Sequence, residues 1–125
     1  ADSRTFISPT PRQPTLLGVN STTLARMAAQ RTDGVNVCGS ADYAQDVIEA
    51  AVQERSTVRE GATAKSDDPF MVTVWEHFDE SLLRREPLDE RIARWASWGV
   101  NRVILLMFRG VDLVAIDRAA AHLRG

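Results

Sequence analysis

PTLLGVNSTTLARMAAQRTDGVNVCGS, residues 14–40, is the stretch of the chain that decides its fold. Its first six residues are mostly apolar and have the length of a strand, and their lack of alternation is typical of a strand buried on both faces. A helix follows, in which Leu24, Met27 and Ala28 recur at a spacing that predicts one buried face. A polar Thr-Asp-Gly turn ends the helix, and a valine-rich run begins a second strand. The stretch therefore predicts a βαβ unit with parallel strands and a right-handed crossover.

The turn between the first strand and its helix, Gly18-Val19-Asn20-Ser21-Thr22, is the part of this unit that can bind a ligand. Glycine allows the chain to turn sharply or allows a ligand to approach it closely. The first N–H groups of a helix lack intrahelical partners and carry a positive partial charge, so beside hydroxyl groups they can hold a phosphate. An ordinary helix N-cap accounts for the same residues without any ligand. Spacing alone favours the N-cap, because no lysine follows and a single glycine carries the turn.

The rest of the chain repeats the order of a strand and then a helix. Strands are expected over 15–19, 34–38, 70–76 and 102–108, and the later helices over 41–60, from 87 to 99, and from 111 onward. The residues expected to face the core are Ala44, Val47, Ile48, Ala51, Val52 and Val58 in the second helix, Leu88, Ile92, Trp95 and Ala96 in the third, and Leu113, Ile116, Ala120 and Leu123 in the last.

Four βα units in 125 residues are half of a (β/α)8 barrel, which typically takes eight units in about 250 residues. We therefore predict an α/β protein, the (βα)4 half of a TIM barrel with parallel strands over 14–125, preceded by an extended, proline-bearing strap over 1–13. The competing fold is a flavodoxin-like open sheet, which needs five parallel strands. Its fifth strand would have to be the weak segment Thr5–Ser8.

Composition and charge exclude several classes of function. The chain has 44% hydrophobic and 26% charged residues, which is ordinary for one globular domain. Its net charge of −2 gives no basic surface for nucleic acid, and no apolar run has the ~18 residues that span a bilayer. No signal peptide is visible, and the single cysteine cannot form an internal disulfide. We therefore expect a cytoplasmic protein, either standing alone or cut from a longer chain.

Several short motifs carry a resemblance to a known family. PTLLGVNS at residues 14–21 is followed by a helix ending MAAQR and by the strand entry Thr32-Asp33-Gly34-Val35, and residues 98–105 read WGVNRVIL. These motifs resemble the second half of the luciferase-like monooxygenases, in which a proline-led strand, an alanine-rich helix and an Ala-Asp-Gly-Val strand occur in this order. Members of that family are (β/α)8 barrels that use FMN or the deazaflavin F420. The resemblance covers nearly the whole chain but includes no catalytic signature.

The resemblance implies positions for the cofactor. Gly18, Val19, Asn20, Ser21 and Thr22 would hold its phosphate through backbone amides and a hydroxyl group. The residues that would complete this pocket after the second strand are Gly39 and Ser40, and Tyr43 lies where a loop could touch a ligand. Asn20 stands where some members have an acidic residue or glycine, which leaves FMN and F420 both open.

Two further residues are candidates for chemistry. Glu76 and His77 are adjacent on a strand, so only one of them faces inward. His77 could donate a proton, since a histidine titrates near working pH, although its position favours a partly exposed strand-end histidine without a ligand. Arg109 follows the fourth strand and could pair with an anionic group of a substrate, or simply contact solvent. Two distant histidines and one thiol match no metal-ligand spacing.

The resemblance implies an oxidoreductase that transfers a hydride, or activates oxygen, for a small organic substrate. This chain would be its phosphate-binding half and inactive alone. The alternative is a non-catalytic half-barrel module that binds a phosphate-bearing ligand or a partner chain. A receiver-like signalling domain is disfavoured, because no cluster of aspartates ends the first strand. A barrel cut after four units has two unpaired strand edges, so we expect a homo-oligomer or a pairing with a chain that carries the N-terminal half.

Overall fold

The strands of the sheet lie in the order in which they occur along the chain. The computed structural model describes residues 13–61, 69–78, 87–107, 110 and 112–124. They form a four-stranded sheet, all parallel, in the order β1-β2-β3-β4. The bounds are β1 (Leu16–Gly18), β2 (Gly34–Cys38), β3 (Met71–His77) and β4 (Arg102–Leu106). This confirms the expectation of parallel strands, and the expected bounds lie within about two residues of the observed ones.

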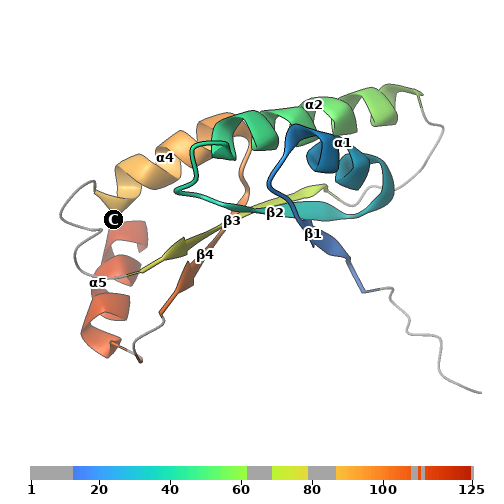
Figure 1. Cartoon of the computed structure of the whole chain (residues 1–125). Helices are drawn as coiled ribbons and strands as arrows, with labels where there is room; N and C mark the ends of the chain where they lie inside the picture. The colour runs from blue at the N-terminus through green and yellow to red at the C-terminus, as the bar shows by residue number, and fades with distance from the viewer. Residues whose placement is uncertain (1–12, 62–68, 79–86, 108–109, 111, 125) are drawn as a thin grey trace, which may run out of the picture.

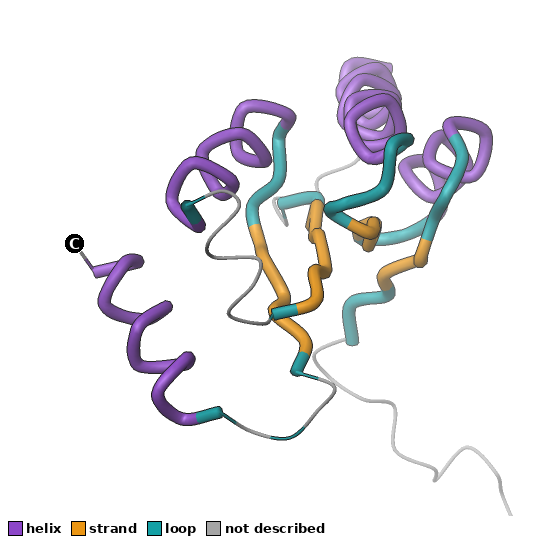
Figure 2. The backbone as a smooth tube through the Cα atoms, turned by 60° about the vertical axis from the view of Figure 1, so that its left-hand side comes forward, coloured by secondary structure: helices purple, strands orange, loops and turns teal. Residues whose placement is uncertain are grey.

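Each strand is followed by a helix, and these helices lie along one side of the sheet. They are α1 (Thr22–Arg31), α2 (Ala44–Gly61), α4 (Leu88–Trp98) and α5 (Leu113–Arg124). Figure 1 shows α1, α2 and α4 above the strands, and in Figure 2 the helices follow one another along the same side of the strands. None of the described helices is long and apolar enough to cross a membrane.

The sequential strand order argues against the flavodoxin-like alternative. A doubly wound sheet reverses its strand order at one point, which places helices on both of its faces. The described strands show no such reversal. The segment Thr5–Ser8, which that fold would need as a fifth strand, lies outside the described residues, as do most of the strap over 1–13 and Phe108 of the expected fourth strand.

The core lies between the sheet and the helices, and valines supply the sheet side of it. Val35, Val37, Val72 and Val74 are fully buried or nearly so, which is the period of two expected for one face of a sheet. On the helix side the largest fully buried side chain is that of Trp95. The other members of this cluster are Val19, Ala25, Ala28, Ala44, Val47, Ile48, Ala50, Ala51 and Val100.

The expected buried faces of the first and last helices are only partly correct. In α1, Ala28 is buried as expected, but Leu24 and Met27 are exposed, and the alanines Ala25 and Ala29 are buried instead. Small side chains let α1 approach the sheet and α2 closely, and the larger residues point to the free side of the unit. In α5, likewise, Leu113 and Ile116 are exposed, and Ala115 and Ala119 are buried.

Three smaller expectations also need correction. The strand β1 is not buried on both faces, because it lies at the edge of the sheet and Leu17 is exposed. Helix α2 begins at Ala44 rather than 41, because the N–H of Ala41 bonds to the carbonyl of Cys38 in a turn. In α4, Ala96 is exposed.

The turn before β4 fixes that strand to β3 through one side chain. The Asn101 side chain accepts a hydrogen bond from the Val72 N–H at 3.0 Å and donates one to the Phe70 carbonyl at 2.9 Å. Its own N–H bonds to the carbonyl of Val72 at 2.9 Å. Helix α4 ends just before, at Gly99, whose φ of 105° favours glycine. The glycine and the asparagine of this Gly-Val-Asn turn are therefore explained by the end of α4 and by the hydrogen bonds of Asn101 to β3.

Two strand glycines provide a matched test of this packing. A Cβ added to Gly34 would collide with the backbone carbonyl of Met71 on the neighbouring strand, whereas nothing lies within 4 Å of a Cβ added to Gly18. We expect Gly34→Ala to lower the free energy of unfolding by about 1–3 kcal/mol, as overpacking does. Gly18→Ala should change it by less than about 0.5 kcal/mol. Urea unfolding followed by circular dichroism measures both, and equal losses would contradict the described register.

Candidate functional site

A hollow of about 360 Å³ lies at the carboxyl ends of β1, β2 and β3. This is the edge of a parallel α/β sheet at which ligands bind. The residues that line it are Gly18, Val19, Asn20, Leu24, Asn36, Cys38, Tyr43 and Trp75. Three residues of the predicted phosphate turn therefore belong to the hollow, together with residues from the next two strands.

The strand residues of the hollow lie on the sheet face opposite the helices, which we call the far face. Since Val35 and Val37 point to the helices, Asn36 and Cys38 point the other way. In the register of β2 and β3, Asn36 pairs with Thr73 and Cys38 with Trp75, so these four residues share the far face.

A buried hydroxyl group fixes the position of Asn36. The Thr73 hydroxyl lies 2.6 Å from Oδ1 of Asn36 and 3.0 Å from the carbonyl oxygen of Val35. Its single proton is shared between these two acceptors. Thr73 is fully buried, so this contact is shielded from water and orients the Asn36 amide at the floor of the hollow.

The turn after β1 begins α1 with an N-cap. The Ser21 hydroxyl accepts a hydrogen bond from the Leu24 N–H at 3.2 Å, which is the capping role expected without a ligand. The N–H of Val19 bonds to the carbonyl of Asn36 at 3.1 Å and so belongs to the sheet. By helix geometry the N–H groups of Thr22 and Thr23 have no intrahelical acceptor. These two amides lie in the chain between Asn20 and Leu24, which both line the hollow, while the Ser21 hydroxyl already has a partner.

Gly18 lines the hollow and lies in the strand rather than in the turn. It lies within β1, and the only described glycines with positive φ are Gly99 and Gly110. The sharp turn that Gly18 was expected to allow is therefore not formed at this residue. Because nothing lies within 4 Å of a Cβ built on it, a side chain there would project into open space at the hollow.

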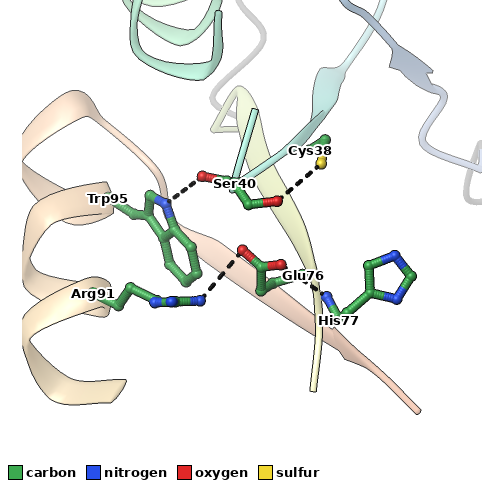
Figure 3. A network of polar contacts seen from close by, with 7 residues as sticks. Cys38, Ser40, Glu76, His77, Arg91 and Trp95 are labelled. Atoms are coloured by element: carbon green, nitrogen blue, oxygen red, sulfur yellow. Dashed lines mark hydrogen bonds and ion pairs between the residues drawn. The ribbon is translucent and has the colours of Figure 1, made fainter. Parts of the chain in front are cut away.

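The two residues after β2 that were predicted for the pocket, Gly39 and Ser40, are not among the described residues that line the hollow. Gly39 donates its N–H to the carbonyl of Trp75 at 2.8 Å, and its carbonyl accepts from Nε1 of Trp95 at 3.2 Å. A Cβ on Gly39 would lie 2.8 Å from the Trp95 ring, so this glycine is explained by close packing, and the structure does not bring it to the hollow. Ser40 is exposed, and its hydroxyl lies 3.6 Å from the Cys38 sulfur, as Figure 3 shows.

Glu76 and His77 point to opposite faces of β3, as expected for neighbours on a strand. Figure 3 shows Glu76 turned towards Arg91 of α4 and His77 turned away from it. Glu76 is buried, and its Oε2 lies 3.4 Å from Nη1 of Arg91. The exposed His77 ring meets the Trp75 ring edge-on, with centroids 5.5 Å apart, but does not line the hollow.

The remaining candidates add little to the site. Arg109 lies outside the described residues, so its predicted role in binding a substrate stays a prediction. Among the residues that the structure describes, no three His, Cys, Asp or Glu side chains gather as metal ligands would.

Asn36 and Trp75 were not among the residues predicted for the site. The signal that could have found them is the period of two in β2 and β3. Valines at 35, 37, 72 and 74 mark the helix-facing positions, so the polar and aromatic residues between them had to face the other way. Which of them lie beside Gly18 depends on the strand register, which the sequence pattern does not contain.

Comparison of the chain with protein-family models, with curated proteins and with solved structures finds no match. The relation to the luciferase-like monooxygenases therefore stays a resemblance of motifs.

The buried pair of Glu76 and Arg91 gives the second prediction. Arg91→Met leaves the Glu76 carboxylate buried without its cation, so we expect the free energy of unfolding to fall by about 3 kcal/mol or more. Adding Glu76→Leu should restore most of that loss, because an apolar pair of similar volume removes the uncompensated charge. Thermal unfolding of the parent, the single variant and the double variant measures this. A double variant no more stable than Arg91→Met would contradict a structural role for the pair.

Proposed function

We propose that this chain is the cofactor-binding half of a luciferase-like oxidoreductase that uses FMN or F420, built on the (βα)4 half of a TIM barrel. Two features support the half-barrel. Strands that follow one another in sequential order, with helices along one side, are the arrangement of a (β/α)8 barrel. The hollow also lies at the carboxyl ends of the strands, where such barrels place their sites.

The observation that carries the proposal is the composition of the hollow beside the start of α1. Trp75, Tyr43 and Leu24 offer apolar surface, Asn20 and Asn36 offer amide groups, and the first N–H groups of α1 lie next to them. Ligand sites combine apolar surface with a few such polar groups in about 300–1,000 Å³. A hollow of about 360 Å³ is at the small end of that range, so it suits one part of a cofactor rather than all of it.

These residues fit the phosphate end of a flavin-type cofactor. Asn20 and the amides of Thr22 and Thr23 would hold the phosphate, since a helix N-terminus binds anions through free N–H groups. Gly18 leaves the space that the ligand needs. When bound, such a cofactor supplies the hydride transfer or oxygen activation, and the protein binds and orients it. His77, exposed on the far face beside Trp75, is the candidate for moving a proton to or from a small organic substrate.

A non-catalytic module that binds a phosphate-bearing ligand is the second candidate. One observation favours it: no carboxylate or imidazole is among the described residues that line the hollow. The buried carboxylate of Glu76 points to the helices and is held by Arg91. In this role the hollow and the α1 N-terminus would bind the ligand, and the chain itself would perform no reaction.

Ligand titration tests the phosphate assignment. We expect FMN to bind at least about 10-fold more tightly than riboflavin, which has the same ring without the phosphate, because charge-assisted hydrogen bonds to the phosphate contribute more than about 1.4 kcal/mol. Flavin fluorescence measures both affinities, and F420 is titrated in the same way. Inorganic phosphate should compete with FMN. Equal affinities for FMN and riboflavin would show that the phosphate does not bind at this turn.

Gly18→Val is the matching variant. The space around a Cβ at this position is open and lies at the hollow, so we expect FMN affinity to fall at least about 10-fold while the unfolding midpoint changes little. Gln53→Glu, an exposed substitution on α2, is the control and should leave FMN binding unchanged. Unaltered FMN binding by Gly18→Val would place the ligand elsewhere. The absorbance of the protein as purified, with a flavin band for FMN and a shorter-wavelength band for F420, separates the two cofactors.

A further inference from the structure

We propose that two copies of this chain close into one eight-stranded barrel, in which β4 of each copy pairs in parallel with β1 of the other. The inference uses the half-barrel architecture of the proposed function but requires no cofactor. It arises from two strand edges and two exposed apolar surfaces that the fold leaves at opposite ends of the sheet.

Each outer strand of the described sheet is paired on one side only. β1 pairs with β2, and β4 pairs with β3, so the backbone groups on the other side of each outer strand have no strand beside them within the described residues. Such edges favour pairing with another chain, and a closed barrel removes them. Closure takes eight parallel strands with helices outside, so the missing part is another set of four βα units. A second copy supplies that set.

The first exposed surface, which we call the α1 patch, lies beside the β1 edge. It consists of Leu17 of β1 with Leu24 and Met27 of α1, which are 41%, 39% and 42% exposed. Leu24 and Met27 are three residues apart and so share one side of the helix. Because the alanines of α1 pack on its own unit, these larger apolar residues are left without a described partner.

The second exposed surface, which we call the α5 patch, lies beyond the β4 edge. It consists of Leu113, Val114 and Ile116, which are 69%, 60% and 42% exposed. The opposite side of α5 packs through Ala115 and Ala119 against Leu88 of α4. Helix α5 therefore continues the row of helices and lies at its end, as Figure 2 shows. Its large apolar residues are exposed.

Charges favour contact between the α1 patch of one copy and the α5 patch of the other. Helix α1 carries Arg26 and Arg31 and no acidic residue. The α5 patch is flanked by Asp112 and Asp117, both exposed, while the cationic Arg118 already interacts within its own chain. Contact between two α1 patches would bring arginines together, whereas contact of α1 with α5 brings opposite charges together.

The symmetry of this contact closes the assembly. A two-fold axis along the barrel keeps all strands parallel and produces the β4–β1 contact twice, so no edge remains. It also encloses the far face, which carries Asn36, Trp75 and His77. The second copy would therefore form the other wall of each hollow, and the candidate site is complete only in the dimer.

Paired charge variants test the proposal. In a dimer of Met27→Glu, or of Ile116→Lys, both contacts bury an unpaired charge against apolar residues, so we expect the dissociation constant to rise at least about 100-fold, a factor of 10 for each contact. An equimolar mixture of the two variants should dimerise again, because one contact is then unaltered and the other pairs glutamate with lysine. Sedimentation velocity at micromolar concentration measures the parent, each variant and the mixture.

Control variants separate the contact from general effects. Gln53→Glu and Ala93→Lys place the same charges on exposed positions of α2 and α4 and should leave the dimer unchanged. The conservative variants Met27→Leu and Ile116→Val should also remain dimers, which keeps the test valid if a charged variant folds poorly by circular dichroism.

Three results would overturn the inference: a monomeric parent, a mixture that stays monomeric, or loss of the dimer with Met27→Glu but not with Ile116→Lys. The last result would mean that two α1 patches pair with each other. A monomeric parent that binds FMN would remove this inference and leave the proposed cofactor site standing. A dimer that does not distinguish FMN from riboflavin would remove the cofactor site and leave the assembly standing.

Discussion

The handedness of the crossover between parallel strands determines how this protein is organised. Because strand–helix–strand connections are right-handed, a sheet whose strands follow one another in order receives its helices on the same side. One face can then be apolar throughout, and the valines at 35, 37, 72 and 74 provide it. The residues between them are free to be polar or aromatic, as Asn36, Thr73 and Trp75 are. The same constraint that builds the core thus leaves the far face without these helices, and it leaves each outer strand of the described sheet paired on one side only.

The strands could be predicted because their signals are local. Alternating valines mark β2 and β3, and Thr32-Asp33-Gly34 marks the entry to β2. The structure adds a reason for that glycine, since a Cβ would meet the Met71 carbonyl of the next strand. Gly99 likewise ends α4 where its sequence position indicates, with a φ that other residues rarely adopt. In each case a residue type and its immediate neighbours are sufficient to place the element.

The buried faces of α1 and α5 could not be predicted, because hydrophobicity alone ranks leucine above alanine. Close packing reverses that order: Ala25, Ala28 and Ala29 permit α1 to lie near the sheet, and a leucine there would overfill the core. Leu24 and Met27 are then displaced to the free side. An apolar stripe in a sequence predicts a surface that is shielded from water. It does not predict whether the residues that cover this surface belong to the same folded unit.

The candidate site likewise combines residues that the local sequence predicts with residues that only the pairing of the strands brings to it. Gly18 and Asn20 were predicted from their own turn, whereas Asn36 and Trp75 join them only through the strand register. Gly39 illustrates the converse: it was expected to contact a ligand, but its carbonyl accepts a hydrogen bond from Trp95, 56 residues away. Its N–H bonds to the carbonyl of Trp75, which lines the hollow. Packing of the Trp95 ring against Gly39 therefore positions one wall of the hollow from behind the sheet, so the shape of the candidate site depends on the core.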